Sequence, residues 1–271
     1  MPQSRASVFL PMALLALLAV PRAAVAELGS DTTRGWGAYV SETERRIQQE
    51  VGSPHGFLGI DFEPDAADVR RQAGQGSVVM RHVRGPDDGR TAVPGGLVHH
   101  WRGVIFVPGI SVRELLGRLR KEAPPEQPED VLVSRVLATG DNWMRVYLRL
   151  RRRKIVTAVF NTEHLVRFME HGAARASSTS IATRIAEVSD PGGPDERERT
   201  PGHDRGFLWR LNAYWRFEEV RGGVIAECES ISLSRPIPAV VRALAAPLVE
   251  RAARESLDRT LTLFRSHYGR R

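Results

Sequence analysis

The chain has 271 residues, of which 42% are hydrophobic, 26% charged and 7% aromatic. This composition excludes a collagen-like repeat, a disulfide-rich scaffold and a disordered acidic tail, and the length predicts one large domain or one domain with an extension. The formal net charge of +7 leaves nucleic acid and anionic lipid open as partners, while a single cysteine excludes an internal disulfide.

The first 26 residues have the order of a secretory signal: a basic start with Arg5, an apolar run over 8–20, and the small residues Ala24-Val25-Ala26. The apolar run of about 13 residues is shorter than the roughly 20 residues that span a bilayer. We therefore expect cleavage after Ala26 and a periplasmic or secreted protein, with a retained N-terminal anchor as the alternative. Export argues against nucleic acid as a partner.

The segment 27–94 is expected to be a helical extension. Residues 36–51 place apolar side chains among charged ones at helical spacing, and a second short helix is expected over 64–73. A run of turn residues, 85–89, then interrupts the chain. Residues 95–268 are expected to form the main domain.

The main domain begins with a strand and a helix and continues as a run of strands. A strand is expected over 97–107, and Ser111 can cap a helix because Glu114 follows at the capping-box spacing. After a proline-rich loop, five further strands are expected over 131–138, 144–150, 155–160, 164–169 and 177–188. A long polar loop, 189–206, follows them.

A hairpin is the clearest element of the sequence. Its first strand carries apolar side chains at every second position, namely Phe207, Trp209, Leu211, Ala213, Trp215 and Phe217. A two-residue turn at Arg221-Gly222 or Gly222-Gly223 leads into a returning strand over 224–233. One face of the hairpin then combines these large residues with smaller ones that include Cys228.

The opposite face of the hairpin carries charge. The pairing places Arg216 beside Glu227 or Glu229, which is a favourable cross-strand arrangement. We therefore expect Glu227 and Glu229 to form ion pairs with Arg210 and Arg216 on the outer face of the sheet.

The last predicted element is a long helix over 237–268. Pro247 is expected to kink or divide it, because proline lacks an N–H donor and clashes with the preceding turn. An apolar stripe that includes Leu257, Leu261 and Phe264 follows the helical period. At 1.5 Å per residue, the helix is long enough to lie across a whole sheet.

Several short motifs mark the main domain: GGLVHHW (95–101), VPG (107–109), NTEH (161–164), TRIAEV (183–188), GFLWRLN (206–212), YWRFEE (214–219), CESISLSR (228–235) and RESL (254–257). Together with the order of elements, they resemble a family of exported bacterial proteins in the START-like, or SRPBCC, superfamily. The resemblance implies an α+β helix-grip fold, in which a curved antiparallel sheet surrounds a long C-terminal helix. It also implies a cavity between sheet and helix for a hydrophobic small molecule or lipid.

Ten residues are the candidates for lining such a cavity: Phe207, Trp209, Leu211, Ala213, Trp215, Phe217, Cys228, Leu257, Leu261 and Phe264. Small residues in the strand over 177–188, either the odd-numbered set or Ser178, Ser180 and Ala182, leave space beneath the helix. The alternative is that side chains of the helix fill this space as an ordinary core.

The sequence offers little that is typical of an enzyme. His99 and His100 point to opposite faces of a strand and cannot readily share a metal ion, and neither HExxH nor CxxC occurs. No phosphate-binding glycine motif or nucleophile elbow is present, so neither a metal nor a cofactor is expected. A cyclase or hydrolase that uses His99, His100, the Glu163-His164 pair or another glutamate in the cavity is the alternative function, and it predicts a polar group with a perturbed pKa there. A structural module without a cavity is a third alternative.

Two further features remain open at this stage. The basic cluster Arg149, Arg151, Arg152, Arg153 and Lys154 is expected at a hairpin tip, where it could contact an anionic membrane surface or form a solvated turn. The lone Cys228 is expected to be buried and inert, with intermolecular pairing as the alternative.

Overall fold

The computed structural model describes residues 26–84, 93–126, 129–153, 157–237 and 242–270. The predicted signal segment up to residue 25, the predicted turn over 85–89 and Lys154 lie outside the described residues.

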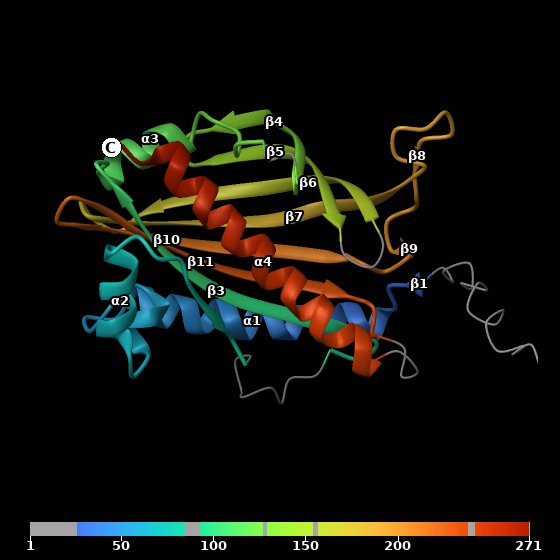
Figure 1. Cartoon of the computed structure of the whole chain (residues 1–271), viewed down its shortest axis with the longest axis horizontal. Coiled ribbons are helices and arrows are strands. Elements are labelled where there is room, and N and C mark those ends of the chain that lie inside the picture. Colours follow the sequence, from blue (N-terminus) through green and yellow to red (C-terminus); the bar gives the residue numbers. More distant parts are fainter. Residues whose placement is uncertain (1–25, 85–92, 127–128, 154–156, 238–241, 271) are drawn as a thin grey trace, which may run out of the picture.

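One antiparallel sheet forms the centre of the molecule (Figure 1). In spatial order its strands are β2 (Val79–His82), β3 (Leu97–Pro108), β11 (Gly223–Ser234), β10 (Arg210–Val220), β7 (Arg175–Ser189), β6 (Thr157–Glu170), β5 (Trp143–Arg153) and β4 (Val131–Gly140). The short strand β8 (Arg197–Glu198) pairs with β7, and β1 (Ala26–Glu27) pairs with β9 (His203–Asp204). The pairing of β4 with β5 shifts register twice, between Val131 and Val133 and between Val136 and Ala138.

The strands follow the predicted segments with two corrections. The described part of the segment 155–160 and the segment 164–169 form the single strand β6. The residues between them keep their pairing with β5, and a bulge at Glu163/His164 absorbs the irregularity. The polar loop 189–206 contains β8 and β9. The hairpin turn is Arg221-Gly222, where Gly222 takes a φ of 86° that favours glycine.

The C-terminal helix α4 (Arg242–Tyr268) crosses one face of the sheet diagonally in Figure 1. Its residues Leu257, Leu261 and Phe264 are buried against the sheet. The predicted α+β helix-grip fold is therefore confirmed. The helix remains a single element through Pro247, so the predicted division is absent.

The short helix α3 (Val112–Leu119) lies at one end of the sheet. The Ser111 hydroxyl accepts a hydrogen bond from the backbone N–H of Glu114 at 3.2 Å, which confirms the predicted N-cap.

The N-terminal segment covers the opposite face of the sheet. It contains α1 (Ser30–Val51), the 3₁₀ helix η1 (Gly59–Phe62) and α2 (Ala66–Gly74). Apolar side chains of α1 pack against β11, and those of η1 and α2 pack against β3 and β11. The same segment also supplies β2, so it contributes an edge strand as well as a helical layer.

Between this layer and the sheet lies a buried network of ion pairs. Glu229 accepts hydrogen bonds from Arg102 at 2.9 and 3.2 Å, and Oε1 of Glu229 lies 2.7 Å from Nε2 of His100. The carboxylate of Glu227 accepts the backbone N–H groups of Gly59 and Ile60 at 2.8 and 3.0 Å. Both glutamates are fully buried.

The network corrects one prediction and confirms another. Arg216 lies directly opposite Glu227, as predicted, with 3.3 Å between Nε and Oε1. These charges are enclosed beneath α1 instead of facing solvent. The ion pair expected between Arg210 and a glutamate is absent among the described residues: Arg102 pairs with Glu229, while Arg210 donates to the carbonyl of Trp209. The sequence pattern identifies the charged face, but not the layer that covers it.

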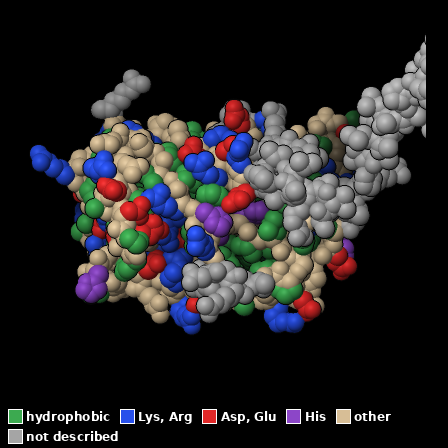
Figure 2. All heavy atoms as spheres, turned by 60° about the horizontal axis from the view of Figure 1, so that its bottom comes forward, with side chains coloured by type: hydrophobic (Ala, Val, Ile, Leu, Met, Phe, Trp, Pro, Cys, Tyr) green, Lys and Arg blue, Asp and Glu red, His purple; other side chains and the backbone are tan. Residues whose placement is uncertain are grey.

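The surface on this side of the molecule mixes both charges. Figure 2 shows basic and acidic side chains interspersed on the face turned forward from the bottom of Figure 1. Among the described helices, none is long and apolar enough to cross a membrane.

Candidate ligand-binding site

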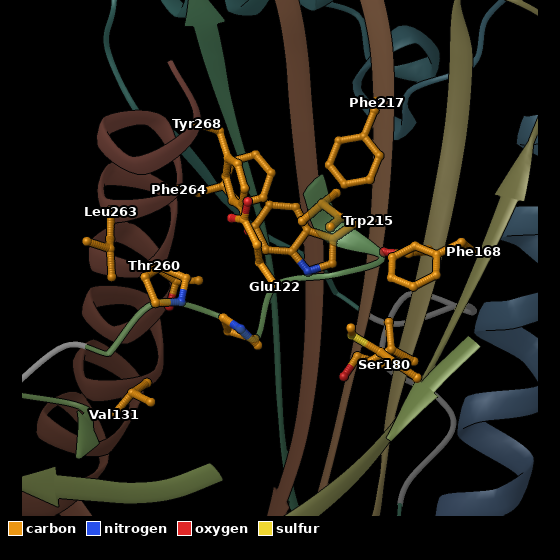
Figure 3. Close-up of a pocket in the computed structure, with 16 residues that line it drawn as sticks. Glu122, Val131, Phe168, Ser180, Trp215, Phe217, Thr260, Leu263, Phe264 and Tyr268 are labelled. Atoms are coloured by element: carbon orange, nitrogen blue, oxygen red, sulfur yellow. The ribbon is translucent and has the colours of Figure 1, made fainter. Parts of the chain in front are cut away.

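A cavity of about 150 Å³ lies between α4 and the part of the sheet formed by β5, β6, β7 and β10. Thr260, Leu263 and Phe264 line it from α4. Leu119 comes from the end of α3, and Pro124 from the segment between α3 and β4. In Figure 3, Thr260 and Leu263 lie on the opposite side of the cavity from Phe168 and Ser180, with the ring of Trp215 between them.

Aromatic rings form the end of the cavity where α4 meets β10. The ring centroids of Trp215 and Phe264 are 4.7 Å apart, and those of Phe217 and Phe264 are 5.9 Å apart, with planes inclined by 25° and 10°. Tyr268 extends the group, with its ring centroid 4.7 Å from that of Phe264. Aromatic pairs of this kind contribute about 0.5–1.5 kcal/mol each beyond their buried area, so they fix the helix to the sheet.

The sheet side of the cavity contains polar groups. Ser178 and Ser180 lie on the same face of β7 and both line the cavity. Beside Ser180, on the same face of β6 as Val166, lies His164. Its Nδ1 is 3.4 Å from the serine Oγ, and its Nε2 is 3.0 Å from Oγ1 of Thr162. Burial lowers the pKa of His164 from 6.5 to about 4, so its ring is neutral at pH 7.

One charged side chain, Glu122, stands among the described residues that line the cavity. Arg118 donates to its carboxylate at 3.1 and 3.2 Å, and Nε2 of His267 lies 3.2 Å from it. The hydrogen bonds from Arg118 lower the pKa of Glu122, and this group therefore stays ionised. Glu122 is 37% exposed, which places it at the boundary between cavity and solvent.

A second ion pair borders the cavity where β4 begins. Arg259 of α4 donates to the buried carboxylate of Asp130 at 2.7 and 3.1 Å. The next residue along each chain segment, Val131 and Thr260, lines the cavity. The pair therefore joins the helix to the start of β4 at the wall of the cavity.

The predicted lining residues fall into three groups. Trp215, Phe217 and Phe264 line the cavity. Ala213, Cys228, Leu257 and Leu261 belong to the same core cluster without reaching the cavity. Burial raises the pKa of the Cys228 thiol, as is usual for an inert core cysteine.

The third group lies elsewhere. Trp209 packs with α1 on the opposite face of the sheet, while Phe207 and Leu211 join a separate cluster with Leu150 and Phe160. For Phe207 and Trp209 the cause is that β10 begins at residue 210, so the period of two does not extend into the preceding bend. Leu211 lies within β10 but packs with the neighbouring cluster instead of reaching the cavity.

Sequence analysis missed part of the lining. The segment between α3 and β4 was assigned only as a loop, and no pattern in it indicates a contact with the cavity. Phe168 lies on β6, beside Ser178 in the strand pairing. The even-numbered serines of β7, one of two alternatives in the sequence, are the set that faces the cavity.

His99, His100 and Arg149 lie away from the cavity, whereas Arg152 reaches Asp130 at its border. His100 lies within the buried ion network, and Nε2 of His99 is 3.1 Å from the Ser234 hydroxyl. Arg149 binds Glu196, and Arg152 lies 3.5 Å from Asp130. Arg151 is half-buried and Arg153 ends β5. In the described ranges, no group of three or more His, Cys, Asp or Glu residues could hold a metal ion.

Comparison with known proteins gives matches at the level of structure. No protein-family model and no curated protein matches the sequence. The structure is similar to a STAR-related lipid transfer protein from Xanthomonas axonopodis, at 15% identity and a TM-score of 0.40, covering 65% of this chain and 95% of that chain. It is also similar to a START superfamily protein from Mycobacterium smegmatis, at 11% identity and a TM-score of 0.39, covering 63% and 97% of the two chains.

An aromatase/cyclase from Streptomyces is a further similar structure, at 13% identity and a TM-score of 0.35, covering 64% of this chain and 94% of that chain. The similar structures thus include proteins named for lipid transfer and a protein named as an enzyme.

Proposed function

We propose that this protein binds, and carries, a hydrophobic small molecule or lipid in the cavity beneath α4. The observation that supports this proposal is a cavity of about 150 Å³ with mainly apolar and aromatic walls inside an otherwise packed core. The cavity opens to solvent beside Glu122, which is 37% exposed. A bound apolar group would displace water from these apolar walls, which is favourable.

The size of the cavity limits what can enter it completely. An engineered apolar cavity of about 150 Å³ takes up one benzene molecule. The cavity thus accommodates one ring or the end of one acyl chain, and a larger ligand would extend past Glu122 towards solvent.

The test is extraction of the purified protein with organic solvent and identification of the released molecules by mass spectrometry. Val166→Phe places a ring in the cavity and is expected to abolish the bound material, with an unchanged circular dichroism spectrum. Leu165→Phe, on the opposite face of β6, is the matched control and is expected to retain it. An empty protein that also takes up no fluorescent fatty acid, sterol or quinone would contradict the proposal.

Catalysis in the same cavity has one candidate pair, Ser180 with His164. We favour binding because the pKa of about 4 makes this imidazole a weak base, and because a threonine, in place of a carboxylate, holds its other nitrogen. Hydrolysis of a p-nitrophenyl ester is expected to be equal in the wild type and in Ser180→Ala. Loss of hydrolysis in the variant would favour an enzyme.

We also propose export to the periplasm or to the outside of the cell, supported by the signal-like order of residues 1–26. Ala26 pairs with Asp204 in the structure, so cleavage after Ala26 would leave Glu27 as the only residue of β1. N-terminal sequencing of the mature protein is expected to begin at Glu27. A sequence that begins at Met1 would contradict the proposal.

A peripheral contact with anionic membranes remains our proposal for the basic residues at the end of β5. Its support is the charge of residues 151–154, each worth roughly 1 kcal/mol near an anionic surface. Sedimentation with phosphatidylserine vesicles is expected to fall when Arg153 and Lys154 are changed to serine. The same changes are expected to have no effect with phosphatidylcholine vesicles.

A further inference from the structure

The charge around the cavity discriminates between classes of ligand. Among the described residues that line the cavity, Glu122 is the one charged side chain. The arginines at its border are already paired, Arg118 with Glu122 and Arg259 with Asp130. A ligand anion placed there would lose its hydration without gaining a cation and would face the carboxylate of Glu122. A neutral ligand meets neither cost.

The polar groups of the wall have free hydrogen-bonding capacity. Ser178 is 6% exposed, and its hydroxyl finds no hydrogen-bond partner among the described residues. Trp215 lies directly opposite Ser178 in the pairing of β10 with β7, and its indole N–H is likewise without a partner in the described ranges. Both groups line the cavity and are open to a ligand oxygen, and a hydrogen bond between neutral groups contributes about 0.5–1.5 kcal/mol.

The hydrogen bonds beside Ser180 determine what its oxygen can offer. The Thr162 hydroxyl donates its one hydrogen to the carbonyl of Leu148 at 3.0 Å, so Nε2 of His164 must donate to Thr162. In the neutral ring Nδ1 is then an acceptor, and the Ser180 hydroxyl donates to it. The lone pairs of Ser180 Oγ are thereby left to accept a hydrogen bond from the cavity.

We propose that the cavity selects a neutral, ring-sized apolar group with one hydroxyl, which donates to Ser180 and accepts from Ser178 or Trp215. Ser178 and Ser180 are neighbours on one face of β7, about 7 Å apart along the strand, and Trp215 lies opposite Ser178, so a ligand of ring size contacts all three. The inference rests on the proposed binding function and adds the class of ligand. It favours an alcohol or phenol over a carboxylic acid or an ether.

Four probes of similar size test the inference by calorimetry at pH 7: phenol, anisole, toluene and benzoate. Phenol both donates and accepts, anisole only accepts, toluene does neither, and benzoate is an anion. We expect phenol to bind the wild type more tightly than anisole, and benzoate to bind at least tenfold more weakly than phenol. The double variant Ser178→Ala/Ser180→Ala is expected to lose about tenfold in phenol affinity and none in toluene affinity.

Two further variants keep the result unambiguous. Thr179→Ala lies between the serines on the opposite face of β7 and is expected to leave every affinity unchanged. Trp215→Phe keeps an aromatic ring and removes the N–H, so it should lower the affinity for phenol more than the affinity for toluene. This variant tests the inference even if the double serine variant does not fold.

The outcomes separate the two proposals. If the affinities for phenol and toluene fall by the same factor in the variants, or if benzoate binds as tightly as phenol, the selection for a hydroxyl group is overturned while the binding cavity stands. If none of the four probes binds the wild type and no molecule is recovered by solvent extraction, the proposed function fails together with the inference.

Discussion

His164 lies beside the cavity wall with its ring held between a threonine and a serine. Its folded-state pKa of about 4 lies below the usual 6.5, so the unfolded chain binds the proton more tightly. The neutral form therefore supports folding fully above about pH 6.5, and this stability is lost as the pH falls towards 4. For a shift of this size the loss amounts to about 3 kcal/mol.

We predict that His164→Gln flattens the decrease in unfolding free energy between pH 6.5 and 4, because the glutamine amide cannot titrate. Urea unfolding at several pH values measures this change. His99, whose burial also lowers its pKa to about 4, should preserve part of the decrease in the variant. The exposed His55→Gln is the control, and an equal decrease in both variants would refute the assignment.

For single residues, the sequence predicts the face of a strand only in part. The alternation that correctly placed Trp215 and Phe217 on one face failed at Trp209, because a strand period holds only where the strand continues. Ser178 and Ser180 could be assigned to a face only once the pairing with β10 was known.

At the scale of elements, the N-terminal layer is attached to the sheet by charge as well as by apolar contacts. Burial opposes ionisation of Glu229, but Arg102 and His100 outweigh it and hold its pKa well below the usual range. Arg46 of α1 also binds this carboxylate. Removing one member of a buried pair leaves its partner without compensation, which costs about 3–5 kcal/mol.

We therefore predict that Glu229→Gln lowers the unfolding free energy by about 3–5 kcal/mol, measured by urea denaturation. Arg34→Ala, which removes an exposed pair with Asp31 on the same helix α1, should change it by less than about 1 kcal/mol. Similar effects of the two substitutions would contradict a buried network.

The ion pair between Asp130 and Arg259 should control how easily the cavity opens. It joins α4 to the start of β4 at the cavity wall, so its loss is expected to let the two separate more often. Asp130→Asn should increase the rates of uptake and release of a fluorescent hydrophobic probe several-fold in stopped-flow measurements. Asp141→Asn, at an exposed turn, should leave both rates unchanged. Equal rates in all three proteins would show that the pair does not limit entry.

At the scale of the molecule, two helical layers enclose one sheet, and both depend on the same strands. Trp36 packs between α1 and β11, whereas Trp215 packs between α4 and β10. β10 and β11 are paired along their whole length, so the two layers pack on the two faces of one continuous pair of strands.

We predict a single cooperative unfolding transition. Variants that keep only Trp36 or only Trp215, with the other tryptophans changed to phenylalanine, should give urea midpoints that coincide with each other and with circular dichroism. An earlier transition reported by Trp36 would show that the N-terminal layer unfolds separately.

The order of elements followed from the sequence because periodicity, the Ser111 cap and the hairpin turn are local signals. The fold class came from the resemblance of this order, and of the short motifs, to a known superfamily. The sequence did not predict that the N-terminal segment covers the second face of the sheet. It depends on contacts such as that of Gly59 with Glu227, which are 168 residues apart in the chain and leave no periodic trace.

An open sheet has a consequence for behaviour at high concentration. Its terminal strands, β2 and β4, present backbone groups that could pair with another molecule. β2 is only four residues long, and β4 loses its regular spacing twice and carries the exposed Arg135. These interruptions shorten the regular backbone available to a neighbour, so the sheet can remain open around its cavity without serving as a template for aggregation.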